Sequence, residues 1–284
     1  MKVSVCITTF NHEMFIEQAL DSVLMQEVDF DYEVIIGEDD SSDNTRNIVK
    51  AYKEKYPNKI RLFLNDRKNI IYIDGKPTGR WNFLNNLQNS RGQYIALLDG
   101  DDFWTSKHKL QKQVDFMEDH TECAICFHNA LLLDNDENVG KTMLPDNFKK
   151  ISSLEDLLHG NFIPTCSTLF RNHLFSEFPE WYLKIRMGDW PLHILNAQFG
   201  KIGYINEVMG CYRKHKGSNW SSKKLVDQYL LSNTACNYFK RLFHGNDRYL
   251  EIIDSTIKEY NTIIAQEYKN SGDYLKYIFH RLRS

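Results

Sequence analysis

Strand-like and helix-like patterns alternate along roughly the first 135 residues, and this alternation constrains the fold more than any other feature. Short β-branched runs predict strands at residues 3–8, 32–37, 60–64, 94–98 and 123–133. Between them, apolar residues recur with helical spacing over residues 13–26, 45–56, 81–90 and 107–120. Such alternation predicts βαβ units. We therefore expect an α/β fold whose mostly parallel sheet is flanked by helices.

The remaining chain is less regular and then becomes helical. We expect a loop at residues 134–141, a short helix at 153–160, a strand at 166–170, a helix at 189–200, and one or two strands over 201–215. No strand pattern is found beyond Ser221. The chain is long enough for one large domain with a smaller appendage. We predict a domain over residues 1–220 and a helical C-terminal extension over residues 221–284.

Composition excludes some classes of protein. A formal net charge of -3 gives no field that favours nucleic acid. The N-terminal run is too short for a secretory signal, and no apolar run reaches the ~20 residues of a membrane span. The six cysteines lie mostly in apolar runs. Cys123 and Cys126 have metal-site spacing, but they would face opposite sides of a strand and lack partner ligands. We predict core thiols and a cytoplasmic location.

Two groups of acidic residues follow predicted strands. "YIALLDGDDFW" ends a strand with Asp99, Asp101 and Asp102, and "IIGEDDSSDNT" ends another with Glu38 to Asp40. A helix N-terminus explains one or two acids. The carboxyl ends of parallel strands meet at one edge of a sheet, where ligands bind. Carboxylates there suit Mg²⁺ or Mn²⁺, with phosphate oxygens completing the coordination.

Four segments, in this order and spacing, resemble family 2 glycosyltransferases of GT-A fold. They are "VSVCITTFNHEMFIEQALDSVLMQ", "YEVIIGEDDSSDNT", "SRGQYIALLDGDDFW" and "GDWPL". The resemblance covers residues 1 to about 220. It implies a nucleotide-sugar donor with Mn²⁺ or Mg²⁺ on its diphosphate, and attack by a hydroxyl of a glycan or lipid-linked glycan with inversion. It also implies a nucleotide-binding half at 1–103 and an acceptor-binding half at 104–220, in biosynthesis of a bacterial polysaccharide or similar glycan.

The resemblance also assigns roles to donor-binding positions. Thr8 and Phe10 stand where the family holds the base, and Asp39 matches the acid expected to accept from a base N–H. Phe10 replaces the commoner tyrosine, which removes a hydroxyl contact. Asp40 stands where glycine is usual, which places another charge beside the base. A UDP-sugar is the expected donor, while donors whose base is thymine or guanine remain alternatives.

The same comparison assigns the diphosphate and metal positions. Asp99 is expected to face the ribose and Asp101 to bind the metal, with Asp102 as a second candidate. Arg80 precedes a helix, where the family often carries a cation for the diphosphate; a solvated arginine is the alternative. His215 lies in "GCYRKHKGSNWS" and is a candidate metal or diphosphate contact, while a structural histidine remains an alternative.

Inversion requires a general base, because the attacking hydroxyl must lose its proton. The family places an acid where Asp189 stands in "IRMGDWPLHI". A helix N-terminus would help to keep it ionised, and a plain N-cap is the competing interpretation. His193 could touch an acceptor, and Trp190 or Trp220 could stack on a sugar; a place in the core is the alternative for each.

Other functions and partners stay open. A sugar nucleotidyltransferase would usually carry a glycine- and lysine-rich phosphate loop, and "TTFNHEMF" has no glycine. A non-catalytic nucleotide-sugar binder would not need Asp189. The tail over residues 221–284 holds ten Lys/Arg and seven Asp/Glu and ends in "YLKYIFHRLRS". That end could lie on the anionic cytoplasmic face of a membrane, pack on the main domain, or join two subunits as a homodimer.

Overall fold

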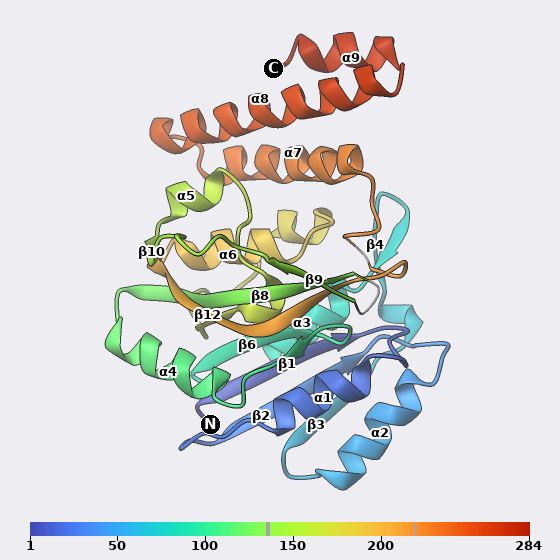
Figure 1. Ribbon diagram of the computed structural model, residues 1–284, viewed down its shortest axis with the longest axis vertical. Helices are drawn as coiled ribbons and strands as arrows, with labels where there is room; N and C mark the ends of the chain where they lie inside the picture. Colours follow the sequence, from blue (N-terminus) through green and yellow to red (C-terminus); the bar gives the residue numbers. More distant parts are fainter. Residues whose placement is uncertain (135–136, 219) are drawn as a thin grey trace.

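The computed structural model describes residues 1–134, 137–218 and 220–284, and over these a ten-stranded sheet forms its centre (Figure 1). Strands β3 (Ile60–Leu64), β2 (Tyr32–Glu38), β1 (Val3–Thr9) and β6 (Tyr94–Asp99) lie parallel in this order. The short β11 (Leu169–Arg171) is antiparallel to both β6 and β8 (Cys123–Asp134). β12 (Lys201–Lys214) is parallel to β8. The predicted mostly parallel α/β sheet is confirmed.

Smaller strands extend this sheet at its edges. β10 (Ile151–Ser152) and β7 (Phe103–Trp104) pair antiparallel with β12, and β9 (Glu137–Thr142) pairs with β8. β4 (Ile71–Ile73) and β5 (Lys76–Thr78) form a separate hairpin. Short 3₁₀ turns occupy Arg67–Asn69, Thr165–Ser167 and Glu180–Lys184.

Helices cover both faces of the sheet and bury two apolar clusters. α1 (Ile16–Leu24), α2 (Thr45–Lys55) and α4 (Lys109–Asp119) share one cluster with Val3, Val5 and Ile7 of β1. α3 (Arg80–Gln88), α5 (Leu154–Leu158) and α6 (Asp189–Ala197) share the other with Cys6. Successive residues of a strand point to opposite faces, so a strand buried on both sides is apolar throughout.

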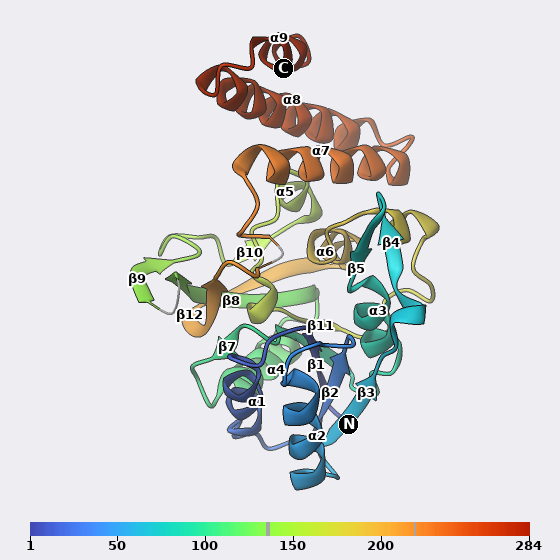
Figure 2. The same cartoon turned by 90° about the vertical axis from the view of Figure 1, so that its right-hand side faces the viewer.

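The C-terminal part is helical, as predicted. α7 (Leu225–Leu242), α8 (Asp247–Asn270) and α9 (Tyr274–Arg281) stack in successive layers away from the sheet (Figures 1 and 2). Phe239 of α7 and Ile253 of α8 belong to the apolar cluster that covers the sheet. No helix in the part of the chain described here is long and apolar enough to cross a membrane. The domain boundary at residue 220 stays a prediction.

The irregular middle of the chain differs from the prediction in three places. The segment predicted as a loop at 134–141 contains β9; residues 135 and 136 lie outside the described part. The strand expected at 166–170 begins later, as β11, because a 3₁₀ turn precedes it. Residues 201–214 form one continuous strand. Pairing of β12 with β8 along its whole length explains this continuity.

All six cysteines are free and buried, as predicted for core thiols. The expectation that Cys123 and Cys126 face opposite sides was wrong, because both lie in the cluster beneath α1 and α4. Lys201 pairs with Cys123 but Ile202 pairs with Ile125, which leaves one extra residue in β8. Such a β-bulge interrupts the alternation of side chains.

Candidate active site

The carboxyl ends of β6, β1 and β2 bring the two acidic segments together. The amide of Gly100 donates to the carbonyl of Thr8 at 2.8 Å, and the amide of Asp39 donates to the carbonyl of Thr9 at 3.0 Å. Each acidic turn is therefore fastened to the end of the same central strand. We call the space above these strand ends the acidic crevice.

Asp99 lies at the centre of the acidic crevice. The hydroxyl of Thr8 donates to its Oδ1 at 2.7 Å. Burial, together with the neighbouring charges of Asp101 and Asp189, raises the pKa of Asp99 to about 7 against the lowering effect of the Thr8 hydrogen bond. Near neutral pH both the protonated and the ionised form of this carboxyl are therefore populated.

Asp101 is paired with histidine. His215 Nε2 lies 3.0 Å from Asp101 Oδ2, and His12 Nε2 lies 3.8 Å from the same oxygen. Burial alone would raise the pKa of Asp101, but the His215 hydrogen bond and the charges of His12 and His215 together hold it below its ordinary value. Burial also lowers the pKa of His12. The two histidines thus favour the ionised form of Asp101.

Asp102 points into the protein. Its side chain is 1% exposed, and its Oδ1 accepts from the amide of Arg213 at 2.8 Å. Burial, with the charges of Asp101 and Asp99, raises its pKa well above the ordinary range. Arg213 donates from Nη1 to the carbonyl of Asp101 at 2.5 Å, and its guanidinium lies 5.0 Å from the ring of Phe15 and 4.7 Å from that of Phe103. Asp102 and Arg213 therefore fasten the end of β12 to the acidic turn.

The positions that the family resemblance assigns to the base lie at the end of β1 and on the turns that follow β1 and β2. Glu38 is buried, accepts from the amide of Ser41 at 2.6 Å and pairs with Arg46. This supports the turn that carries Asp39, whose Oδ2 lies 3.9 Å from where a Cβ on Gly79 would be. Glu38 is thus structural, while Asp39 faces the start of α3.

The turn after β1 interlocks with the turn after β2. The amide of Asn11 donates to Ser41 Oγ, and Asn11 Oδ1 accepts from the amide of Ser42, both at 2.9 Å. Asn11 adopts a positive φ of 55°, a conformation that asparagine tolerates better than most residues. Phe10, just before it, is 38% exposed. These bonds fix the two turns that the resemblance assigns to the base.

Asp189 is the first residue of α6. Its Oδ2 accepts from Asn161 Nδ2 at 2.9 Å. The residue before the helix is Gly188, so Asp189 is not in the N-cap position. Its charge contributes, after burial and the charge of Asp101, to the raised pKa of Asp99. The positive end of the α6 dipole favours an ionised carboxylate at this place.

Arg80 contacts the segment that leads to Asp189. It is 4% exposed, and its Nη2 donates to the carbonyls of Ile185 and Met187, each at 2.7 Å. A Cβ added to Gly188 would lie 2.9 Å from Arg80 Nη1. The guanidinium is therefore held against the backbone just ahead of the helix.

Of the remaining histidine and tryptophan candidates, His193 and Trp190 are buried and Trp220 is exposed. His193 and Trp190 are both buried, and Trp190 Nε1 donates to the carbonyl of Leu157 at 2.9 Å. Their side chains belong to the core beneath α6. Trp220 is 37% exposed. His12 and Asn161 were not predicted as site residues from the sequence; the only signal for His12 was its place in the short segment after the first predicted strand.

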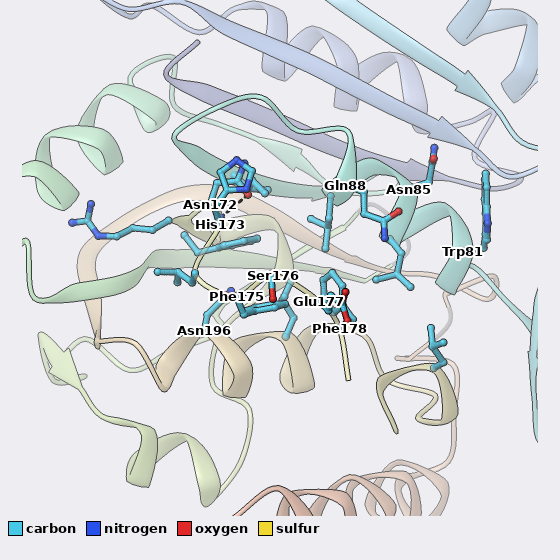
Figure 3. A pocket seen from close by; sticks show the side chains of 18 of the residues that line it. Trp81, Asn85, Gln88, Asn172, His173, Phe175, Ser176, Glu177, Phe178 and Asn196 are labelled. Carbon is cyan, nitrogen blue, oxygen red and sulfur yellow. Dashed lines mark hydrogen bonds between the residues drawn. The ribbon is translucent and has the colours of Figure 1, made fainter. Parts of the chain in front are cut away.

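A separate cavity of about 710 Å³ lies between α3, α6 and residues 170–178 (Figure 3). Trp81 lines it at the beginning of α3 and Gln88 at the end, and Phe175 lies in the facing segment. The carboxyls of the acidic crevice do not line this cavity. The candidate active site is thus the crevice at the strand ends.

Within the described residues, no group of three or more His, Cys, Asp or Glu side chains is arranged to hold a metal ion. Asp101 and His215 supply a carboxylate oxygen and an imidazole nitrogen side by side. Two protein ligands suit a cation whose remaining ligands are phosphate oxygens. This pair fits Mn²⁺ or Mg²⁺ bound together with a diphosphate.

Comparison with known sequences gives a family and several relatives. The family model described as "Glycosyl transferase family 2" matches residues 4–177. Uncharacterized protein Rv1520 of Mycobacterium tuberculosis is 33% identical over 78% of this chain and 61% of its own length. This chain thus spans about three fifths of that relative.

Two further relatives have assigned names. The putative teichuronic acid biosynthesis glycosyltransferase TuaG of Bacillus subtilis is 32% identical over 78% of this chain and 82% of its own. A Campylobacter jejuni protein named GalNAc(5)-diNAcBac-PP-undecaprenol beta-1,3-glucosyltransferase is 26% identical over 97% of this chain and 83% of its own.

Solved structures share the fold. S. aureus TarS in complex with UDP-GlcNAc superposes with a TM-score of 0.61 at 19% identity, covering 98% of this chain and 89% of TarS. Mannosyltransferase PcManGT from Pyrobaculum calidifontis, in complex with GDP-Man and Mn²⁺, superposes with a TM-score of 0.60 at 14% identity. The match covers 99% of this chain and 82% of PcManGT. The fold is GT-A, and the matched sequence includes β1, β2, β6 and the acidic turns. The chain belongs to glycosyl transferase family 2.

Proposed function

We propose that this protein transfers a sugar from a nucleotide-sugar donor, a UDP-sugar, to a hydroxyl of a glycan or lipid-linked glycan. The reaction inverts the anomeric carbon and serves biosynthesis of a bacterial polysaccharide or related glycan. The observation that carries the proposal is the pairing of Asp101 with His215 at the strand ends, together with Asp99, whose raised pKa reflects the charges of both Asp101 and Asp189. TuaG, the Campylobacter protein and TarS, by their names and titles, support this class of reaction.

The donor would lie along the acidic crevice. Asp39 accepts from the base N–H, and the exposed ring of Phe10 stacks on the base. Asp99, oriented by the Thr8 hydroxyl, faces the ribose; its intermediate pKa lets it accept or donate there. Supporting hydrogen bonds hold these groups before the donor binds, which reduces the entropy that binding must overcome.

Asp101 and His215 would hold Mn²⁺ or Mg²⁺ against the diphosphate, with Asp102 acting indirectly. A bound divalent cation neutralises charge on the leaving diphosphate. We assign Asp102 to positioning, because its Oδ1 already accepts from the Arg213 amide and its side chain is buried. The PcManGT complex with Mn²⁺ supports a metal in this fold.

Asp189 is the general base. The acceptor oxygen attacks the anomeric carbon as the bond from that carbon to the diphosphate breaks, and the hydroxyl proton passes to Asp189. The Asn161 hydrogen bond keeps this carboxylate oriented, and the positive end of the α6 dipole favours negative charge there. Arg80 acts mainly by fixing the backbone before Asp189, since its Nη2 is bonded to two carbonyls there.

A thermal-shift screen of UDP-, GDP- and dTDP-sugars, with and without Mn²⁺, tests the donor and metal assignments. We expect stabilisation by UDP-sugars that requires the metal. Donor binding that does not depend on Mn²⁺ would contradict the assignment of Asp101 as a metal ligand.

Donor hydrolysis with excess Mn²⁺ separates the enzyme from the alternative of a non-catalytic binder. We expect slow release of UDP without acceptor and faster release with the correct acceptor. Tight donor binding without release under any condition would favour the binder.

A further inference from the structure

The outer helix α9 carries a stripe of exposed apolar side chains. Leu275, Ile278, Phe279 and Leu282 are 84%, 52%, 49% and 81% exposed. Their spacing places them on one helical face, because an α-helix makes one turn every 3.6 residues. Single exposed apolar residues are ordinary, but four that adjoin one another mark a contact surface. We call these four residues the α9 stripe.

The rest of α9 is anchored, so the stripe points outward. His280 is buried, with its Nδ1 3.0 Å from Asn261 Oδ1 of α8, and its ring stacks on Tyr268 at 5.7 Å. Asp273 caps the helix by accepting from the amide of Lys276 at 3.2 Å. α9 lies in the outermost layer of the three C-terminal helices (Figures 1 and 2).

Cations flank the α9 stripe on both sides. Residues 274–284 contain Lys276, Arg281 and Arg283 and no aspartate or glutamate. By helical spacing, Lys276 falls on one flank of α9 and Arg281 on the other, and Arg283 lies just beyond the end of the helix. Arg283 lies 3.9 Å from the ring of Phe279, so its aliphatic stem continues the apolar surface. An apolar face bordered by cations matches the boundary between acyl chains and anionic headgroups.

This charge pattern disfavours a second copy of the chain as the partner. A two-fold interface would place one stripe against another. Arg281 and Arg283 would then face cations of the other copy, because the Asp273 that caps α9 already pairs with Lys276 at 3.0 Å, and like charges across an interface oppose association. An anionic lipid surface has no such conflict.

We propose that α9 is a membrane-contact helix that inserts the α9 stripe among anionic lipids. This goes beyond the transfer reaction and names the surface on which the protein works. One short helix with two cations, and a third just beyond its end, predicts reversible attachment that depends on salt. Each cation close to an anionic surface strengthens binding about five-fold.

Co-sedimentation of the full chain with vesicles tests the proposal. We expect binding to vesicles of phosphatidylcholine mixed with phosphatidylglycerol, weak binding to phosphatidylcholine alone, and release by salt. The double variant Leu275→Gln, Leu282→Gln should bind at least about ten-fold more weakly, since two leucines lose their burial. Arg281→Gln and Arg283→Gln should each lower binding about five-fold.

Matched controls change similar residues elsewhere on the C-terminal helices. Leu225→Gln on α7 removes another exposed leucine, and Lys258→Gln on α8 removes another exposed lysine. Both should bind vesicles like the wild type, and circular dichroism should show all variants folded. Vesicle binding is measured without a donor, so this proposal and the transfer reaction can fail separately.

Two results would overturn the proposal. The first is absence of binding to the anionic vesicles, or equal binding by the leucine double variant. The second is a dimer in sedimentation velocity that the same double variant dissociates, because a second copy would then cover the stripe.

Discussion

Carboxyl groups are buried in the acidic crevice, whereas leucines are exposed on α9. Asp102 is 1% exposed and Leu275 is 84% exposed, the reverse of the usual distribution of these residue types. Burying the carboxyls costs free energy that the fold must supply elsewhere, whereas the exposed leucines merely contribute none by burial. The crevice is assembled from turns far apart in the sequence, and its groups perturb one another. The stripe comes from a single helix, and its groups act independently. Changes in the crevice should therefore have large, coupled effects, and changes in the stripe small, separate ones.

The largest effect is expected at Asp189. Asp189→Asn retains an oxygen that can accept from Asn161 but cannot take the acceptor proton, so transfer should fall by about 10²–10⁴-fold. Steady-state transfer assays measure this, and the thermal shift caused by donor and Mn²⁺ serves as the control for binding. Transfer near the wild-type rate with intact donor binding would remove Asp189 as the base.

A second comparison separates two adjacent acids. Asp101→Asn should abolish the dependence of donor binding on Mn²⁺ and reduce transfer about 10²-fold, because a charged ligand is lost. Asp102→Asn keeps an acceptor for the Arg213 amide and should preserve the Mn²⁺ dependence. Titrating Mn²⁺ in the thermal-shift assay checks both variants. The opposite pattern would make Asp102 the metal ligand.

Asp99 should appear in the pH dependence of stability. Because its pKa is raised to about 7, the Asp99 carboxyl stays protonated in the folded protein at pH values where the same carboxyl in the unfolded chain has already lost its proton. The free energy of unfolding from this group therefore falls as pH rises from about 4 to about 7 and is constant above. Asp99→Asn removes this loss and should be more stable than the wild type at pH 8 by at least about 1 kcal/mol.

Urea unfolding at pH 5 and pH 8 measures this difference. The exposed Asp119 on α4 provides a control, since Asp119→Asn should shift stability little at either pH. An Asp99→Asn variant whose stability relative to the wild type does not change with pH would contradict the perturbed carboxyl.

The smallest effect on folding is expected in the α9 stripe. Leu275→Gln with Leu282→Gln should change the free energy of unfolding by less than about 0.5 kcal/mol per site, because both side chains are already exposed. Ile253→Ala in α8, fully buried, should cost about 2–5 kcal/mol. Urea unfolding compares them. A large loss in the stripe variant would show that it packs on the protein.

Most of the fold was predictable, because alternation of strands and helices is a local property of sequence. The rule that parallel strands end at one edge also brought Asp39 and Asp99 to the same crevice. β9 was missed because its sequence, ENVGKT, is short, mostly polar and contains a glycine, which is typical of a loop, and it is held as a strand by pairing with β8. Which face of the sheet Cys123 and Cys126 point to depends on a β-bulge in β8, and no local sequence pattern predicts that bulge.

The details of the site were harder to predict than its location. Asp102 and Arg213 are separated by 111 positions, so their hydrogen bond depends on how β12 crosses the acidic turn. The approach of His12 to Asp101 likewise arises from the turn after β1. The resemblance supplied roles for Asp101 and Asp189, but the partners that tune or orient them are properties of the folded chain.

The close approach of Arg80 to Gly188 has a consequence for how this protein can vary. A side chain at position 188 would collide with the guanidinium, and a shorter residue at position 80 would release the two carbonyls before α6. The two positions therefore limit each other's substitutions. In a library randomised at both, active members should combine glycine at 188 with arginine at 80, or replace the two together. The position of Asp189 would then depend on two residues, at 80 and 188, that can be substituted only together.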